Sequence, residues 1–210
     1  MKYSTYIFDL DGTLSNPLAG MADSINHALA KHDYAERSLD EIATYIGPPL
    51  EGTLANIIGS NDTGQISAVV HSYRDHYRVA GYSNNYLYDG IIDMLNQLRQ
   101  AGAPVGVCTS KPKAAAIMIL EHFDILNYFE FVSGGDVGIK KGQQLEQLLA
   151  EGQIDNKAIM IGDRNVDIIA AQQSELTSLG VLWGFGSAEE LSQAKADHLI
   201  SRPAEVLGLV

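Results

Sequence analysis

Short hydrophobic runs alternate with amphipathic segments along most of the chain. The runs predict strands at about residues 3–8, 105–109, 129–133, 158–161 and 178–182, with a candidate last strand at 197–200. Between them, apolar residues recur at helical spacing over residues 91–100, 113–122 and 143–149. Because strands that alternate with helices pair in parallel, the pattern predicts an α/β fold with a doubly wound parallel sheet.

One long stretch breaks this alternation. Between Asn16 and Asn85 the pattern contains helical stripes but no convincing strand, and Pro, Gly and Asn residues separate the stripes. A stretch of roughly 70 residues is too long for a simple connection inside a compact sheet. We therefore predict an inserted small α-helical domain at residues 16–83 and an α/β core domain made of residues 1–15 and 84–210.

Polar residues follow three of the predicted strands where those strands end. They are Asp9 and Asp11 after the first strand, Thr109 and Ser110 after the second, and Asp163 and Asp167 after the fourth. Ligands of open α/β sheets bind at this edge. Paired carboxylates favour a bound cation, and hydroxyl and free N–H groups at a strand-to-helix turn favour phosphate. Taken alone, an Asp-x-Asp sequence is as typical of a turn, a helix cap or a sugar-nucleotide site as it is of a catalytic site.

The ordered set of motifs resembles that of the haloacid dehalogenase (HAD) superfamily. The matching segments are Asp9-x-Asp11-Gly12-Thr13, Thr109, a downstream lysine, and Gly162-Asp163-x3-Asp167. The resemblance covers the whole chain and implies a Rossmann-like core with an inserted helical cap. The dehalogenases themselves lack the second aspartate, so Asp11 points to the phosphatase and mutase branches. Residues 45–50 and 180–187 resemble the phosphoglycolate phosphatase-like group and its 5′-nucleotidase-like relatives.

The resemblance implies a role for each motif residue. Asp9 would be a nucleophile that forms an aspartyl-phosphate, and Asp11 a general acid and then a general base. Thr109 and the Ser110 amide would hold the phosphoryl oxygens. Mg²⁺ would be the cofactor, and its expected protein ligands are Asp9, the backbone carbonyl of Asp11, Asp163 and, through water or by orienting its neighbours, Asp167.

The resemblance implies that the catalytic, substrate-binding lysine is Lys141, because it stands four residues before the apolar Leu145, as the motif lysine of the family usually does. The adjacent Lys140 remains an alternative, and both could instead be solvated loop cations. Lys111 could reach the substrate or be a surface cation beside Pro112.

Three residues of the inserted domain are expected to help bind the substrate. Gly47 and Pro48 belong to a rigid loop that resembles the substrate-facing loop of the family, and Arg74 could meet a second anionic group. For Arg74, the slightly favoured alternative is that it is an exposed helix residue that binds no ligand.

Composition narrows the possible partners and the compartment. The net charge of −12 argues against nucleic acid as a partner, and no apolar stretch approaches the length of a membrane span. A single cysteine, Cys108, and no recognisable export signal suit a reducing cytoplasm, with Cys108 expected to be a buried packing residue. The six histidines show no metal-binding spacing and are expected at the surface. The expected partner is a small phosphorylated metabolite, and the protein is expected to be a monomer or homodimer.

Together these features predict a Mg²⁺-dependent phosphatase that hydrolyses a small phosphomonoester, of the phosphoglycolate or nucleoside 5′-monophosphate type. A phosphomutase of the β-phosphoglucomutase type would carry the same motifs and remains an alternative. A non-catalytic phosphoryl-accepting regulator is less favoured, because receiver domains have no inserted helical block and need no acid–base group two residues after the aspartate.

Overall fold

The computed structural model describes residues 2–135 and 139–209, which fall into two compact units. The first unit is made of the two ends of the chain, up to Asn16 and from Leu87 onward, and the second spans Pro17–Tyr86. The second unit thus extends to Tyr86, whereas the sequence predicted that it ends at residue 83.

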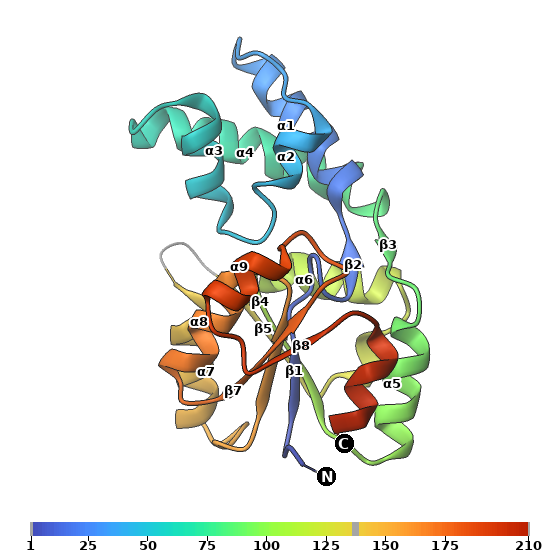
Figure 1. Cartoon of the computed structure of the whole chain (residues 1–210). Helices are drawn as coiled ribbons and strands as arrows, with labels where there is room; N and C mark the ends of the chain where they lie inside the picture. Colours follow the sequence, from blue (N-terminus) through green and yellow to red (C-terminus); the bar gives the residue numbers. More distant parts are fainter. Residues whose placement is uncertain (1, 136–138, 210) are drawn as a thin grey trace. The chain divides into compact units, whose positions relative to one another are not determined.

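A parallel six-stranded sheet forms the centre of the first unit (Figure 1). Its strands, in spatial order, are β5 (Phe131–Gly135), β4 (Val105–Pro112), β1 (Tyr6–Phe8), β6 (Ile159–Gly162), β7 (Thr177–Val181) and β8 (His198–Ile200). Every neighbouring pair is parallel, which confirms the predicted α/β fold class. Because β1 lies between β4 and β6, the residues that follow these three strands meet at one edge of the sheet.

Helices cover both faces of this sheet (Figure 1). They are α5 (Ile91–Gln100), α6 (Lys113–His122), α7 (Lys141–Ala150), α8 (Asn165–Gln173) and α9 (Ala188–Gln193), with short 3₁₀ segments η2 (Leu126–Tyr128) and η3 (Pro203–Leu209). Helices α7 and α8 pack on the face that carries Ile7, Cys108 and Met160. Cys108 is fully buried there, as expected of a packing residue.

All six strands lie within one to three residues of the predicted ranges, and β1 and β4 differ most, by three residues at one end. Strand β1 begins at Tyr6 because the ladders of its two neighbours begin opposite that residue, at Val105 and Ile159. Strand β4 continues to Pro112, so the prediction that the segment after Thr109 is a strand-to-helix turn is wrong. A register shift between Thr109 and Pro112 keeps β4 paired with β5 through this segment.

The second unit is helical. It contains α1 (Leu18–Lys31), α2 (Leu39–Ala43), α3 (Leu50–Ile58), α4 (Thr63–Val79) and the 3₁₀ turn η1 (Gly81–Ser83). The predicted apolar stripes of α1 and α4 supply its core, with Ile25 and Leu29 from α1 and Tyr73 and Tyr77 from α4 all buried. A separate two-stranded sheet is formed by β2 (Ser15–Asn16) and β3 (Tyr86–Leu87).

The expectation that all histidines lie at the surface is wrong for three of them. His76 and His32 are half-buried and share hydrogen bonds with Ser24 and Ser72, at 3.1 and 3.0 Å. His198 is half-buried as well and lies 3.1 Å from the Tyr3 hydroxyl. Each imidazole ring is partly apolar and can be buried when a hydroxyl group satisfies its ring nitrogen. The spacing of histidines in the sequence does not reveal such a partner.

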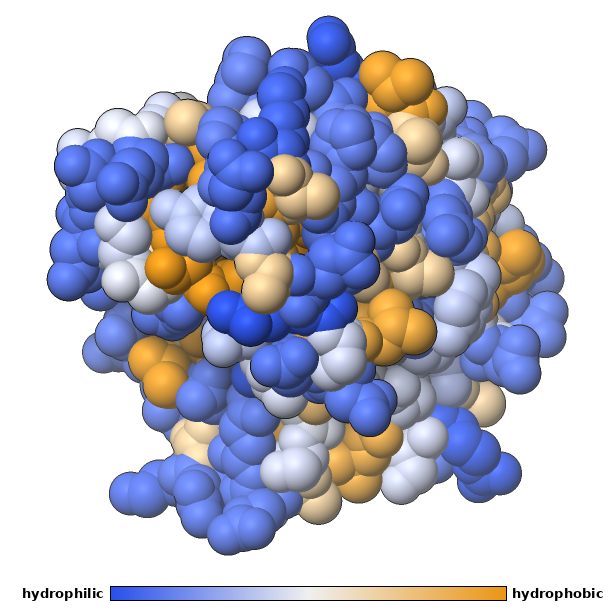
Figure 2. Space-filling model, turned by 90° about the horizontal axis from the view of Figure 1, so that it is seen from above, coloured by the Kyte–Doolittle hydropathy of each residue, from blue (hydrophilic) through white to orange (hydrophobic). Residues whose placement is uncertain are grey.

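The surface seen in Figure 2 is largely hydrophilic, with hydrophobic side chains scattered over it. The most exposed large ones in the described residues lie on different elements, such as Val79 at the end of α4 and Ile92 in α5. Within residues 2–135 and 139–209, no helix is both long and apolar enough to cross a membrane.

Candidate active site

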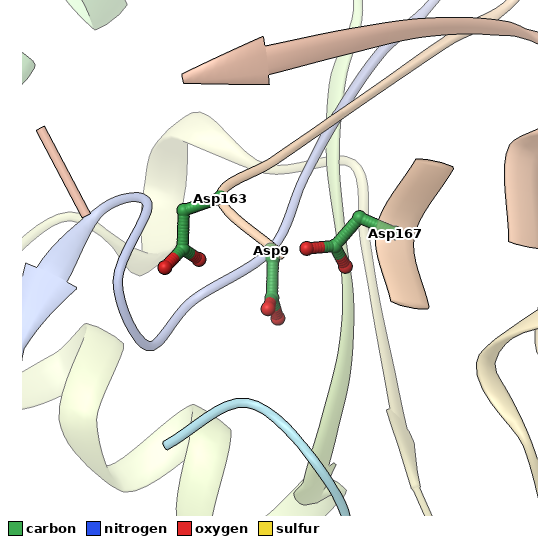
Figure 3. Close-up of side chains that lie close together, drawn as sticks. All are labelled: Asp9, Asp163 and Asp167. Carbon is green, nitrogen blue, oxygen red and sulfur yellow. The ribbon is translucent and has the colours of Figure 1, made fainter. Parts of the chain in front are cut away.

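Three buried carboxylates meet where β1 and β6 end. Asp9 directly follows β1, Asp163 directly follows β6, and Asp167 lies in the first turn of α8. One oxygen of each lies within 4.8 Å of the others. Figure 3 shows Asp9 between Asp163 and Asp167, with the Asp167 carboxylate turned toward Asp9. The sheet order therefore joins two motifs that are more than a hundred residues apart in the sequence.

Asp163 is held by donors from two loops. The Thr13 hydroxyl donates to its Oδ1 (3.2 Å), and the Phe185 backbone N–H donates to its Oδ2 (2.8 Å). Gly12 leaves room for this carboxylate, because a Cβ atom there would lie 2.2 Å from Asp163 Oδ2. Burial, and next the nearby Asp167 and Asp9 charges, raise the pKa of Asp163 to about 8.

Asp167 accepts the backbone N–H of Arg164 at 3.0 Å, a capping contact of α8. Helix α8 begins at Asn165, so Asp163 lies before this helix and Asp167 lies within it. Burial raises the pKa of Asp167 to about 6, although the Lys141 charge opposes this shift.

Lys141 is the cation of this carboxylate cluster. Its Nζ lies 2.9 Å from Asp9 Oδ2 and also pairs with Asp167 Oδ1. Lys141 is the first residue of α7, where the helix dipole disfavours a positive charge. Burial also disfavours the ammonium form, but the Asp167 and Asp9 carboxylates outweigh it and hold the pKa of Lys141 above its usual value. Lys140, the alternative, is exposed.

A second buried ion pair joins Asp11 to Lys111. Lys111 Nζ lies 2.9 Å from Asp11 Oδ2, and the two side chains are 8% and 12% exposed. The sequence allowed two interpretations of Lys111, a substrate contact or a surface cation. The structure excludes the surface position. The one available signal was its place two residues after Thr109 at the same strand end.

Thr109 is buried at the same edge of the sheet, and Ser110 beside it is half-buried. The Thr109 hydroxyl accepts the Lys111 N–H at 3.3 Å. Its carbonyl accepts the side-chain amide of Gln144 (3.2 Å), a buried α7 residue one turn after Lys141. Gln144 was missed by sequence reasoning, because a glutamine in an amphipathic helix carries no signal of its contacts.

The three predicted residues of the inserted domain lie in the second unit, apart in the sequence from the carboxylate cluster. Gly47 adopts a positive φ of 112° in the loop before α3, next to Pro48. Arg74 of α4 pairs with Glu51 of α3, at 2.7 Å. Their part in substrate binding stays a prediction.

The charge balance of the site fits a divalent cation. Four carboxylates (Asp9, Asp11, Asp163 and Asp167) face two ammonium groups (Lys111 and Lys141), so two buried negative charges would be uncompensated with all four ionised, and without a cation the raised pKa of Asp163 favours its protonated form. Oxygen ligands of this kind suit Mg²⁺ or another hard cation. The cluster that could bind it consists of Asp9, Asp163 and Asp167, while the Asp11 side chain is paired with Lys111.

Comparison with known proteins places this arrangement in a family. The sequence profile described as Haloacid dehalogenase-like hydrolase matches residues 6–181. The chain belongs to this family. The prediction of a hydrolase from the phosphatase branch of the HAD superfamily is confirmed at this level.

Relatives of this HAD protein carry several names. A 5′-nucleotidase from Pseudomonas aeruginosa is 34% identical, over 94% of this chain and 91% of its own length. A phosphoglycolate phosphatase from Agrobacterium fabrum is 30% identical, over 85% of this chain and 80% of its own. The tyrosine-protein kinase PtkA of Mycobacterium tuberculosis is 36% identical over 87% of this chain, which spans only 63% of that protein.

Solved structures agree with the fold. The crystal structure of a protein from Clostridium acetobutylicum, titled as a predicted phosphatase, matches with a TM-score of 0.92 and 33% identity. The match covers 98% of this chain and 97% of that one. The Rossmann-like HAD core therefore extends over the whole first unit.

Proposed function

We propose that this HAD protein is a Mg²⁺-dependent phosphatase that cleaves small phosphomonoesters through a phosphorylated Asp9. The observation that carries the proposal is the geometry of Asp9. Its carboxylate directly follows the central strand and lies between the Lys141 ammonium and two further buried carboxylates. No structural salt bridge needs this surplus of buried negative charge, whereas a metal-assisted phosphoryl transfer does.

The reaction divides into two displacements. An Asp9 oxygen attacks the substrate phosphorus, the P–O bond to the alcohol breaks, and Asp11 gives its proton to the leaving oxygen. Asp11 then takes a proton from water as that water attacks the phosphorus, which releases phosphate and restores Asp9. Thr109 and the Ser110 amide bind the phosphoryl oxygens at the carboxyl end of β4.

Lys141 neutralises part of the negative charge at the site, and a metal held by the carboxylate cluster would neutralise more of it. Lys141 pairs with Oδ2 of Asp9 at 2.9 Å, and the Leu10 backbone N–H donates to Oδ1 at 2.7 Å, so these two contacts orient the carboxylate for attack. Asp9, Asp163 and Asp167, with the Asp11 backbone carbonyl, would hold Mg²⁺. The ion would offset the charge of the phosphoryl group and of the cluster.

The substrate is expected to be a small phosphorylated metabolite of the phosphoglycolate or nucleoside 5′-monophosphate type. The names of two relatives, a 5′-nucleotidase and a phosphoglycolate phosphatase, support these two classes. Gly47, Pro48 and Arg74 are the proposed contacts to the part of the substrate beyond the phosphate. We propose a monomeric or homodimeric cytoplasmic enzyme that binds no nucleic acid.

The deciding test is phosphate release from a panel of phosphoglycolate, nucleoside 5′-monophosphates and sugar phosphates, with Mg²⁺ and with chelator. We expect metal-dependent release that Asp9→Asn abolishes. Borohydride reduction of acid-quenched enzyme converts an aspartyl-phosphate to homoserine, so peptide mass spectrometry should locate the modification at position 9.

Other outcomes would contradict the proposal. Formation of glucose 6-phosphate from β-glucose 1-phosphate, without free phosphate, would establish the mutase alternative. Transfer of the ATP γ-phosphate to a tyrosine, again without phosphate release, would align the protein with its kinase-named relative.

A further inference from the structure

We propose that Lys111 is a positioning residue that fixes the Asp11 carboxylate, so that Oδ1 of Asp11 is the oxygen that exchanges the proton during catalysis. This inference rests on the proposed phosphatase function, and it concerns a residue outside the recognised motif set.

The geometry distinguishes the two oxygens of Asp11. Oδ2 lies 2.9 Å from Lys111 Nζ, and the ion pair is largely removed from solvent. A charge-assisted hydrogen bond in such a place is strong and directional. Oδ1 is also buried, yet it has no hydrogen-bond partner among the described residues.

A buried polar atom without a partner requires an explanation, because it loses its hydrogen bonds to water and gains none in the folded protein. At a catalytic acid the explanation is that a substrate atom or a water completes the contact. Lys111 lies on β4, and Asp11 belongs to the loop after the neighbouring strand β1. The sheet itself therefore sets the distance between the two groups.

This arrangement gives each Asp11 oxygen one task. Oδ1 carries the proton to the ester oxygen while the bond from that oxygen to phosphorus breaks. The carboxylate that remains keeps its ion pair with Lys111 through Oδ2. In the second displacement Oδ1 takes the proton of the attacking water. Without Lys111 the carboxylate could rotate, and the acid would lose its alignment with the leaving oxygen.

A competing role for Lys111 is direct binding of an anionic group of the substrate. The two roles differ in which kinetic quantity they change. A positioning role affects the step in which the leaving group departs, and it matters most for leaving groups that need a proton. A binding role raises KM for substrates that carry an extra carboxylate, whatever their leaving group.

The experiment compares an alkyl phosphomonoester with p-nitrophenyl phosphate, whose leaving group departs readily without a proton. The value of kcat/KM reports the steps up to formation of the phosphorylated Asp9. For Lys111→Met we expect kcat/KM to fall about 100-fold on the alkyl ester and less than about 5-fold on the aryl ester. Lys111→Arg, which keeps the charge, should give an alkyl-to-aryl ratio between that of the Lys111→Met variant and that of the wild-type protein.

Lys113→Met is the matched control, because Lys113 is an exposed lysine two residues further along. It should behave as wild type on both esters. Thermal unfolding of each variant shows whether it is folded. Should Lys111→Met not fold, the comparison of Lys111→Arg with wild type decides, and a smaller selective loss on the alkyl ester is then expected.

Equal losses on both esters, or a wild-type ratio in the folded variants, would overturn the inference. So would a loss confined to KM for carboxylate-bearing substrates, which would identify Lys111 as a substrate contact. In each of these cases the wild-type enzyme still releases phosphate, so the proposed phosphatase function is not contradicted. A wild-type protein that releases phosphate from neither ester nor any member of the metabolite panel would instead refute that function, and the role of Lys111 with it.

Discussion

Lys141 Nζ lies 2.9 Å from Asp9 Oδ2, and both side chains are only 3% exposed. This contact predicts that the two adjacent lysines differ sharply in importance. Lys141→Met leaves the buried carboxylates without their cation, which typically costs about 3–5 kcal/mol. We expect phosphate release to be nearly abolished and the free energy of unfolding, measured in urea, to fall by this order.

Lys140→Met is the control for that experiment. Lys140 is exposed, and its described contact is made by its backbone N–H, which donates to the Gln143 side chain. The variant should keep wild-type activity, and its free energy of unfolding should stay within about 0.5 kcal/mol of the wild-type value. Normal turnover by the Lys141 variant would refute the assignment.

Helix α7 also contacts the site through Gln144, which supports Thr109. The Gln144 amide donates to the Thr109 carbonyl at 3.2 Å, and its oxygen accepts from the Ser133 hydroxyl at 3.1 Å. Gln144→Leu keeps the size but removes both contacts, so we expect a stability loss of about 1–3 kcal/mol and a lower kcat, because Thr109 loses its support. The control is Gln147→Leu, an exposed site on the same helix. An unchanged kcat in Gln144→Leu would show that Thr109 does not need this support.

The raised pKa of Asp163 predicts how stability depends on pH in metal-free protein. A carboxyl group with an ordinary value of 3.8 that rises to about 8 on folding binds more protons in the folded state. Its stabilising contribution is complete below its unfolded pKa and is lost as the pH rises through its folded pKa. The Tm in chelator should therefore fall progressively between about pH 4 and about pH 8.

Added Mg²⁺ should raise the Tm most at the alkaline end of that range, because the cation replaces the lost protons. Asp163→Asn should remove most of the decline above neutral pH. A Tm in chelator that rises with pH, or a Mg²⁺ effect of equal size at both ends, would contradict the assigned charge state of the cluster. Differential scanning calorimetry measures both quantities.

A side chain at position 12 is expected to clash with the proposed metal cluster. The φ of Gly12 is +87°, and an added Cβ atom would come within 2.2 Å of Asp163 Oδ2. Gly12→Ala should therefore displace Asp163, lower the apparent Mg²⁺ affinity measured by titrating activity, and destabilise the fold. Gly102→Ala is matched in backbone, with φ +67°, but meets no atom within 4 Å. It should cost only the left-handed strain of about 1–2 kcal/mol and leave the Mg²⁺ affinity unchanged. Equal Mg²⁺ affinities in the two variants would argue against this role of Gly12.

Local patterns predicted most of the elements because they depend on near neighbours in the chain. The helical periodicity of residues 91–100 and 113–122 gave the bounds of α5 and α6 as observed. The bounds of β1 and β4 were missed, since a strand ends where its neighbours stop pairing with it. Periodicity did not predict where α8 starts, because a capping contact between Arg164 and Asp167 sets that position.

The sequence by itself determined the order of strands and helices, the inserted helical block, and the aspartates that follow β1 and β6. All of these depend on periodicity or on short motifs. Only the tertiary structure decided that Lys141 rather than Lys140 is buried against Asp9, and that Lys111 pairs with Asp11. Those contacts join residues about a hundred or more positions apart, and they are brought together by the pairing of β4 with β1 and by the packing of α7 on the sheet. Charge and burial at such distances follow from the packing of the whole unit, which no local pattern encodes.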